Sequence, residues 1–292
     1  MGFVQTLKTG VLTMRRSFGV LRTHPKLLVF PLLSAISLLV FFVGGVIALS
    51  IFAVVSGVGT EIMGGYWWLG TVAVGYFVAA VLSTYFNAAL VHETTRALRG
   101  EVPSISSGFA ASWRIKRKII VWGVLSSVFG VIIEVLENSD NRVAWFVSSI
   151  LQASWAVLTF FVVPVMLFTD TGVRKMFEES ANTFRDVWGE SLTASFGIDL
   201  LSVLAVIAVV VGIVVLGAVG LPGIVFGLGL LVGLVAIFGL LVVRSAAHAV
   251  SKAALYEYAQ TGTMPSVLND IDIQALAGDG EESTSRTSPA GS

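Results

Sequence analysis

Apolar residues dominate six stretches of this chain, and short polar segments separate them. The stretches cover residues 27–55, 67–91, 119–136, 145–168, 192–218 and 223–243. A helix of about 20 mostly apolar residues is long enough to cross the hydrocarbon core of a bilayer. The pattern therefore predicts an all-α, polytopic integral membrane protein with six transmembrane helices.

The polar segments before the first, third and fifth stretches have the spacing of amphipathic helices. Their apolar residues recur three or four positions apart, as on one face of a helix. Before the fifth stretch, Met176, Phe177, Phe184 and Trp188 share such a stripe. Helices of this kind lie at a membrane surface. We therefore expect three hairpins of two spans, each preceded by an interfacial amphipathic helix.

A short motif occurs twice, which also indicates internal repetition. Residues 96–105 read RALRGEVPSI and residues 258–267 read YAQTGTMPSV, so both contain Ala-x-x-Gly-x-x-Pro-Ser. Repetition at a distance is a sign of repeated structural units. We place a six-helix membrane domain at residues 1–264. The remaining residues, 265–292, are small, polar and acidic, and this composition predicts a largely disordered cytoplasmic tail.

Charge gives the expected orientation. Of the 18 Lys and Arg residues, only Arg142 lies in a loop that connects an odd-numbered span to the next even-numbered one. Cytoplasmic loops carry an excess of Lys and Arg. We therefore expect a multi-pass protein of the cell (plasma) membrane with both termini in the cytoplasm.

Composition narrows the chemistry further. Charged residues make up 12% of the chain, against about 25% in soluble domains, and there is no Cys, which excludes disulfides and thiolate sites. His92-Glu93 lacks the second His of a zinc motif, and neither a phosphate-binding loop nor a nucleophile elbow is present. We predict no catalytic, cofactor or metal residues. The basic run at 114–118 precedes a span, so it indicates topology and anionic lipid rather than nucleic acid.

Four polar residues inside the spans are candidates for function: Asn87, Glu134, Gln152 and Asp199. A carboxylate within a span is costly and is a functional hypothesis by default. We expect Glu134 to pair with Arg142, the alternative being a role in transport.

The other three have simpler interpretations. A deep Asp199 would need a partner such as Arg244 or His248, and Asn87 and Gln152 are typical of weak links between helices. Pro164 in the fourth span predicts a kink that frees a backbone carbonyl.

Three stretches carry a family resemblance. They are FFVVPVMLFTDTGVRKMFEESANTFRDVWGESL at 160–192, LRTHPKLLVFPLLS at 21–34 and STYFNAALV at 83–91. Together they resemble an uncharacterised family of six-span integral membrane proteins of bacteria and archaea, catalogued as a domain of unknown function. The resemblance implies a six-helix membrane fold and no established activity, so it transfers no functional residue.

Three classes of function stay open at this point. The first is a non-enzymatic component that organises the membrane or binds lipids or a protein partner on the cytoplasmic face. The stripe of Met176, Phe177, Phe184 and Trp188 is its candidate docking face. The second is a small-solute or lipid transporter, which needs the four polar candidates to line one cavity. The third, a membrane-embedded enzyme, has no visible catalytic constellation.

Overall fold

A computed structural model describes residues 17–56, 67–139, 141–170, 172–218 and 222–262 of the protein. For residues 56, 67 and 188–197 it describes the backbone only. The predicted amphipathic segment before the first span lies mostly outside these residues. The predicted tail, 265–292, lies entirely outside them.

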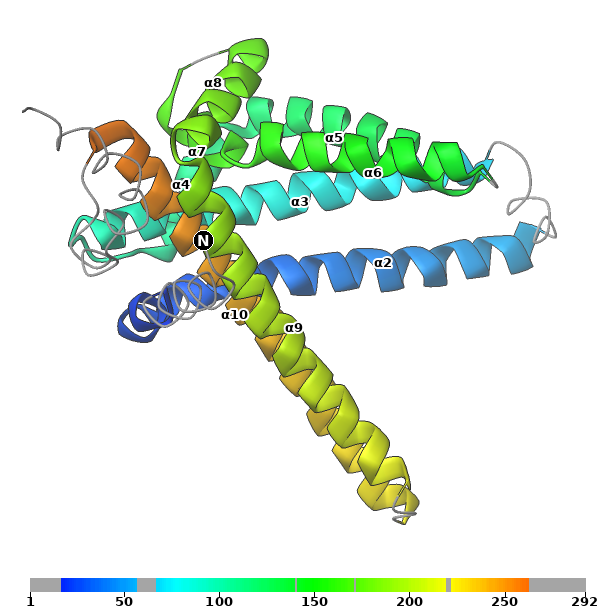
Figure 1. The fold of residues 1–292 in the computed structure, drawn as a ribbon. Helices are drawn as coiled ribbons and strands as arrows, with labels where there is room; N and C mark the ends of the chain where they lie inside the picture. The colour runs from blue at the N-terminus through cyan, green and yellow to red at the C-terminus, as the bar shows by residue number, and fades with distance from the viewer. Residues whose placement is uncertain (1–16, 57–66, 140, 171, 219–221, 263–292) are drawn as a thin grey trace, which may run out of the picture.

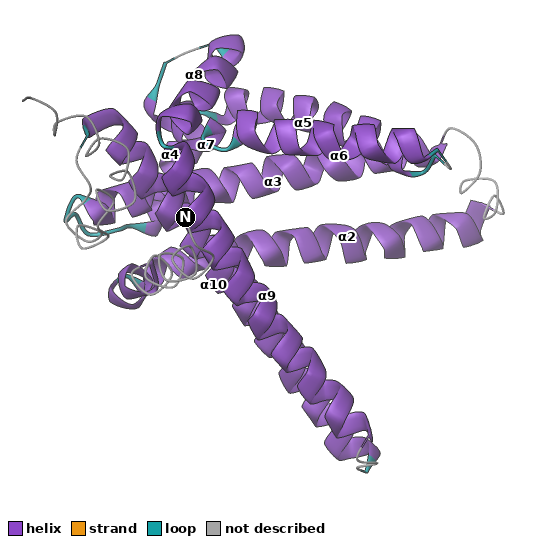
Figure 2. Cartoon of the chain, viewed as in Figure 1, coloured by secondary structure: helices purple, strands orange, loops and turns teal. Residues whose placement is uncertain are grey.

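Throughout the described ranges, all regular secondary structure is helical (Figures 1 and 2). Residues 17–23 form a short helical segment. The elements that follow are η1 Pro25–Leu28, α2 Val29–Ser56, α3 Trp67–Leu98, α4 Ile105–Arg114, α5 Lys116–Glu137, α6 Arg142–Thr159, α7 Val162–Phe168, α8 Val173–Asp186, α9 Trp188–Ala218 and α10 Gly223–Thr261. The all-α prediction is confirmed.

Six helical stretches are long and apolar enough to cross a membrane. They are Pro25–Val55, Trp68–Leu98, Lys116–Glu137, Arg142–Phe168, Ile198–Ala218 and Gly223–Thr261, which agree in number and place with the six predicted spans. Their side chains are poorly covered by protein, since Val54 is 83% exposed and Ile224 is 81% exposed. Apolar surface of this extent needs lipid around it, which indicates a multi-pass membrane protein.

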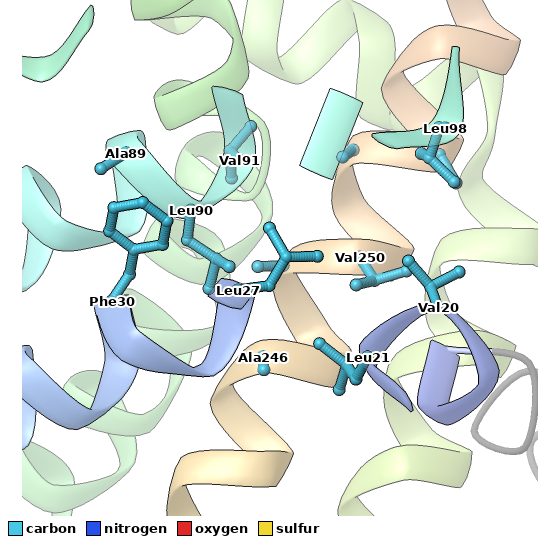
Figure 3. Packing of buried hydrophobic residues seen from close by; sticks show 13 residues of the cluster. Val20, Leu21, Leu27, Phe30, Ala89, Leu90, Val91, Leu98, Ala246 and Val250 are labelled. Atoms are coloured by element: carbon cyan, nitrogen blue, oxygen red, sulfur yellow. The ribbon is translucent and has the colours of Figure 1, made fainter. Parts of the chain in front are cut away.

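The buried side chains gather at one end of the spans, which we call the core end. Leu27, Leu90 and Val250 mark it, and they pack together from η1, α3 and α10 (Figure 3). A second cluster adjoins the first and joins α7, α8 and α10 through Met166, Met176 and their neighbours. Away from the core end, α9 and α10 lie side by side and diverge from α2 and α3 (Figure 1).

Two helices run further at the core end than hydropathy alone predicts. Helix α3 continues to Leu98 and α10 continues to Thr261, because their last turns pack in the core rather than in lipid. Both then stop at a glycine in the left-handed region, Gly100 with φ 81° and Gly262 with φ 68°. Glycine adopts this conformation without a steric cost and commonly ends helices. These are the two glycines of the repeated sequence motif.

The fourth span is broken next to Pro164. Helix α6 ends at Thr159 and α7 begins at Val162, because proline lacks an N–H group and its ring clashes with the carbonyl four residues earlier. The N–H group of Phe161 donates to the Oγ of the buried Ser180 on α8, at 3.1 Å. The side chain of a neighbouring helix thus satisfies a backbone group that the break exposes.

Candidate functional site

A groove of about 540 Å³ lies between α2, α3 and α10 near the core end. Apolar residues such as Leu38 and Phe238 line much of it. Its polar lining consists of Ser34, Ser83, Thr84, Asn87, Arg244, Ser245, His248 and Lys252. Among the residues that the structure describes, no acidic side chain lines this groove, so its polar part carries positive charge from Arg244 and Lys252.

The cationic part of the groove comes from one face of α10. Arg244, His248 and Lys252 follow each other at intervals of four residues, and this interval places side chains one above the other on a helix. Lys252 is not among the four candidates that the sequence predicts. The repeated spacing of Arg, His and Lys along the chain was the signal that would have found it.

Asp199 of α9 balances part of this charge from outside the groove lining. Its Oδ1 accepts hydrogen bonds from Arg244 Nε at 2.9 Å and from Arg244 Nη2 at 2.6 Å. The same oxygen lies 2.7 Å from His248 Nε2. Both residues are the partners that the sequence suggested for Asp199. The contacts link α9 to α10 and hold the side chains of Arg244 and His248 at the groove.

Lys252 has no such counter-charge. Its Nζ lies 4.6 Å from the ring centroid of Phe160, a favourable cation–π distance. Among the residues whose side chains the structure describes, no carboxylate forms an ion pair with it. One carboxylate therefore faces three basic side chains, and the groove keeps an excess of positive charge.

The other two polar candidates lie elsewhere. Glu134 accepts hydrogen bonds from Tyr76 Oη at 3.1 Å and from Asn138 Nδ2 at 2.9 Å. Gln152 donates to Glu137 at 2.7 Å. The expected pairing of Glu134 with Arg142 is not present among the described residues, where Tyr76 and Asn138 are its partners instead.

The four candidates thus fall into two groups. Asn87 lines the groove and Asp199 bonds to two of its residues. Glu134 contacts Tyr76, which precedes Asn87 on α3 by about 16 Å of helix. The structure does not bring the four into one cavity.

The predicted docking stripe on α8 packs largely against the protein itself. Met176 is 1% exposed and Phe184 is 3% exposed, and Phe177 is partly buried in the same cluster. Phe184 meets the ring of Phe160 edge to face at 5.3 Å. The side chain of Trp188 lies outside the described part. A partner would reach Met176 and Phe184 only if α8 moved away from α6 and α7, and docking stays a prediction.

Glu93 is a second polar centre, and the sequence pattern does not single it out as one. It is fully buried, accepts a hydrogen bond from the Ser104 backbone N–H at 2.6 Å and bonds to the Ser107 hydroxyl. His92 Nδ1 and Arg96 Nη1 also lie within hydrogen-bond distance of it. These contacts tie α3 to the first turn of α4. Within the described ranges, no group of three or more His, Cys, Asp or Glu residues is placed to hold a metal ion.

Comparison with known proteins identifies a family. No curated protein and no solved structure matches the chain. One family model, described as a family of unknown function (DUF6159), matches residues 69–266. The match covers more than half of the chain and includes α3 from residue 69, all of α10 and every polar residue of the groove except Ser34. The prediction of an uncharacterised family is therefore confirmed, and the chain belongs to the DUF6159 family of unknown function.

Proposed function

We propose that this protein is a non-enzymatic membrane component that binds lipid in the groove between α2, α3 and α10. The observation that carries the proposal is the groove itself, which combines an apolar lining with Asn87 and a row of basic side chains on α10. Ligand sites typically pair an apolar surface with a few placed polar groups. A lipid supplies both kinds of surface in one molecule.

The proposal includes an orientation in the plasma membrane. Both termini and the core end lie in the cytoplasm, because Lys and Arg concentrate in the segments at that end. The six spans insert as three hairpins, and α4 and α8 lie at the inner surface. This places the groove in the cytoplasmic leaflet, where anionic lipids attract basic residues.

Transport is the second candidate, and the groove supports it less well than binding. A transport route needs polar groups that extend across the spans. Glu134 and Gln152 bond to neighbours on their own side of the protein, away from Asn87 and Arg244. The positions of the polar side chains thus favour a binding site that is open to one leaflet over a transport path that crosses both leaflets.

Native mass spectrometry of the full chain released from nanodiscs tests the proposal. The nanodiscs contain a mixture of phosphatidylcholine and phosphatidylglycerol. We expect one or two lipids to stay bound at activation energies that strip the annular lipid. Loss of all lipid in parallel with detergent removal would overturn the lipid-binding function. Flux of a solute in proteoliposomes together with loss of all lipid would favour the transporter.

A further inference from the structure

We infer that the groove selects an amphiphile with an anionic headgroup, either phosphate or carboxylate. In this inference, the ammonium group of Lys252 recognises the negative charge of the headgroup. The inference rests on the proposed lipid-binding function and names the ligand class. Three features support it: a cation without an ion-pair partner in the described residues, a similar distance of the groove from the far ends of three helices, and an apolar stripe that continues from the groove along α2.

The first feature is the state of Lys252. Its side chain is half-buried and contributes to the lining of a groove in which the described part of the chain places no acidic residue. The contact given for its ammonium group is the face of Phe160, which lies beside the groove lining. Removing an ammonium group from water is costly unless an opposite charge accompanies it. Asp199 is already bonded to Arg244 and His248. An anionic ligand would supply the missing charge.

The second feature is the distance of the groove from the far ends of α2, α3 and α10. Counting about 20 residues from the end of each span that is remote from the core end covers the hydrocarbon thickness of about 30 Å. The count reaches Ala35 from Val55 on α2, Asn87 from Trp67 on α3, and Arg244 from Gly223 on α10. All three residues line the groove. Each helix thus reaches the groove about one hydrocarbon thickness along its axis from its far end, which favours a groove near the lipid headgroups over one at the bilayer centre.

The third feature is a path for a hydrocarbon chain. On α2, the groove is lined by Ser34, Ala35 and Leu38, and the same face continues to a second groove of about 580 Å³ that includes Phe42 and Gly45. The second groove is lined almost wholly by apolar residues of α2 and α3. From Leu38 to Leu49 the stripe is about 16 Å long, which is half of the hydrocarbon core. This is the reach of one acyl chain.

The charge arm of the test compares two lysines. Lys252→Met removes the groove charge and keeps the length of the side chain. Lys116→Met is the matched control, because Lys116 also lies over an aromatic ring, Trp113 at 4.1 Å, but is exposed and outside the groove. Retention of phosphatidylglycerol over phosphatidylcholine is measured by native mass spectrometry from mixed nanodiscs. We expect Lys252→Met to lower this preference roughly tenfold and Lys116→Met to leave it unchanged.

The second part of the test concerns the path of the acyl chain and compares two glycines of α2. A side chain at Gly45 would enter the apolar groove, whereas Gly44 does not line it, and both positions have open space around a Cβ. Gly45→Leu should weaken lipid retention severalfold, and Gly44→Leu should not. Equal effects of the two variants would overturn the path along α2.

Competition with soluble anions distinguishes a lipid ligand from a free anion. Inorganic phosphate and glycerol phosphate, added at millimolar concentration, should not displace phosphatidylglycerol, because neither carries a chain. Displacement by either would make the ligand a soluble anion and overturn the amphiphile. Two results would contradict recognition of an anionic headgroup by Lys252 and leave lipid binding itself intact. One is retention of lipid without a preference for phosphatidylglycerol, and the other is a preference that persists in Lys252→Met. Absence of any retention would instead overturn the proposed function.

Discussion

Arg244 of α10 donates two hydrogen bonds to a single oxygen of Asp199 on α9, from Nε and Nη2. Each side chain is about two-fifths exposed, at 41% and 42%. Solvent screens exposed ion pairs, but shared hydrogen bonds hold this one in a fixed geometry. It is a charged link between α9 and α10.

A double-mutant cycle tests that link. Asp199→Asn and Arg244→Gln should each lower the thermal stability of the detergent-solubilised protein, and the double variant should lose less than the sum. We expect a coupling free energy of about 1 kcal/mol. The exposed pair Arg174–Glu178, at 3.4 Å, is the control and should show a coupling near zero. Additive losses at Asp199 and Arg244 would show that the contact does not stabilise the hairpin.

The break beside Pro164 gives a second prediction. Ser180→Ala removes the acceptor of the Phe161 N–H group in a buried position, and an unsatisfied buried donor costs about 1–3 kcal/mol. Thermal unfolding followed by circular dichroism should show this loss. Ser149→Ala is the control, because that hydroxyl is exposed and bonds only to Trp145 within its own helix. Equal stability of the two variants would mean that another group satisfies Phe161.

A third prediction concerns Glu93. Glu93→Gln keeps the volume, but one acceptor oxygen becomes an NH2 group that faces the Ser104 N–H or the Ser107 hydroxyl. We expect a loss of about 1–3 kcal/mol and faster amide hydrogen exchange in α4. Glu101→Gln changes an acid that is 52% exposed and should do neither. Unchanged protection of α4 in Glu93→Gln would show that other contacts fix this helix.

The proposed orientation is tested by chemical labelling, which the absence of native Cys makes simple. Single cysteines at positions 61 and 139 should react with an impermeant thiol reagent in whole cells. Cysteines at positions 110 and 179 should react only after the cells are opened. The reverse pattern would place the termini outside.

The sequence predicted the number and place of the spans because a helix in lipid must satisfy its own backbone groups over a fixed thickness. It did not predict that α10 continues to Thr261. Residues beyond 243 mix small and charged side chains, and their helix is stabilised by packing on Leu27 and Leu90, which lie far away in the chain. The 3.6-residue period identified the apolar stripe of α8, but it could not distinguish lipid from protein as the surface beneath.

The polar sites were harder to predict than the spans for a related reason. Asp199 and its partners lie on consecutive helices, α9 and α10, whose facing ends are close in the sequence, so their pairing follows from the register of these two helices. Glu134 instead meets Tyr76, 58 residues earlier, through the packing of α5 against α3. Which residues face each other there depends on helix rotation, and a hydropathy pattern does not fix rotation in an apolar span.

The length of α10 has a consequence for the forces that hold the protein. Its 39 residues extend about 58 Å, nearly twice the hydrocarbon thickness. In the proposed orientation, acyl chains surround the first half, and the second half, with the buried residues of the core end, lies at the cytoplasmic surface in contact with water. Apolar burial is driven by water and has no counterpart in lipid. Urea should consequently detach α4 and α8 from the core end at concentrations that leave the six spans helical.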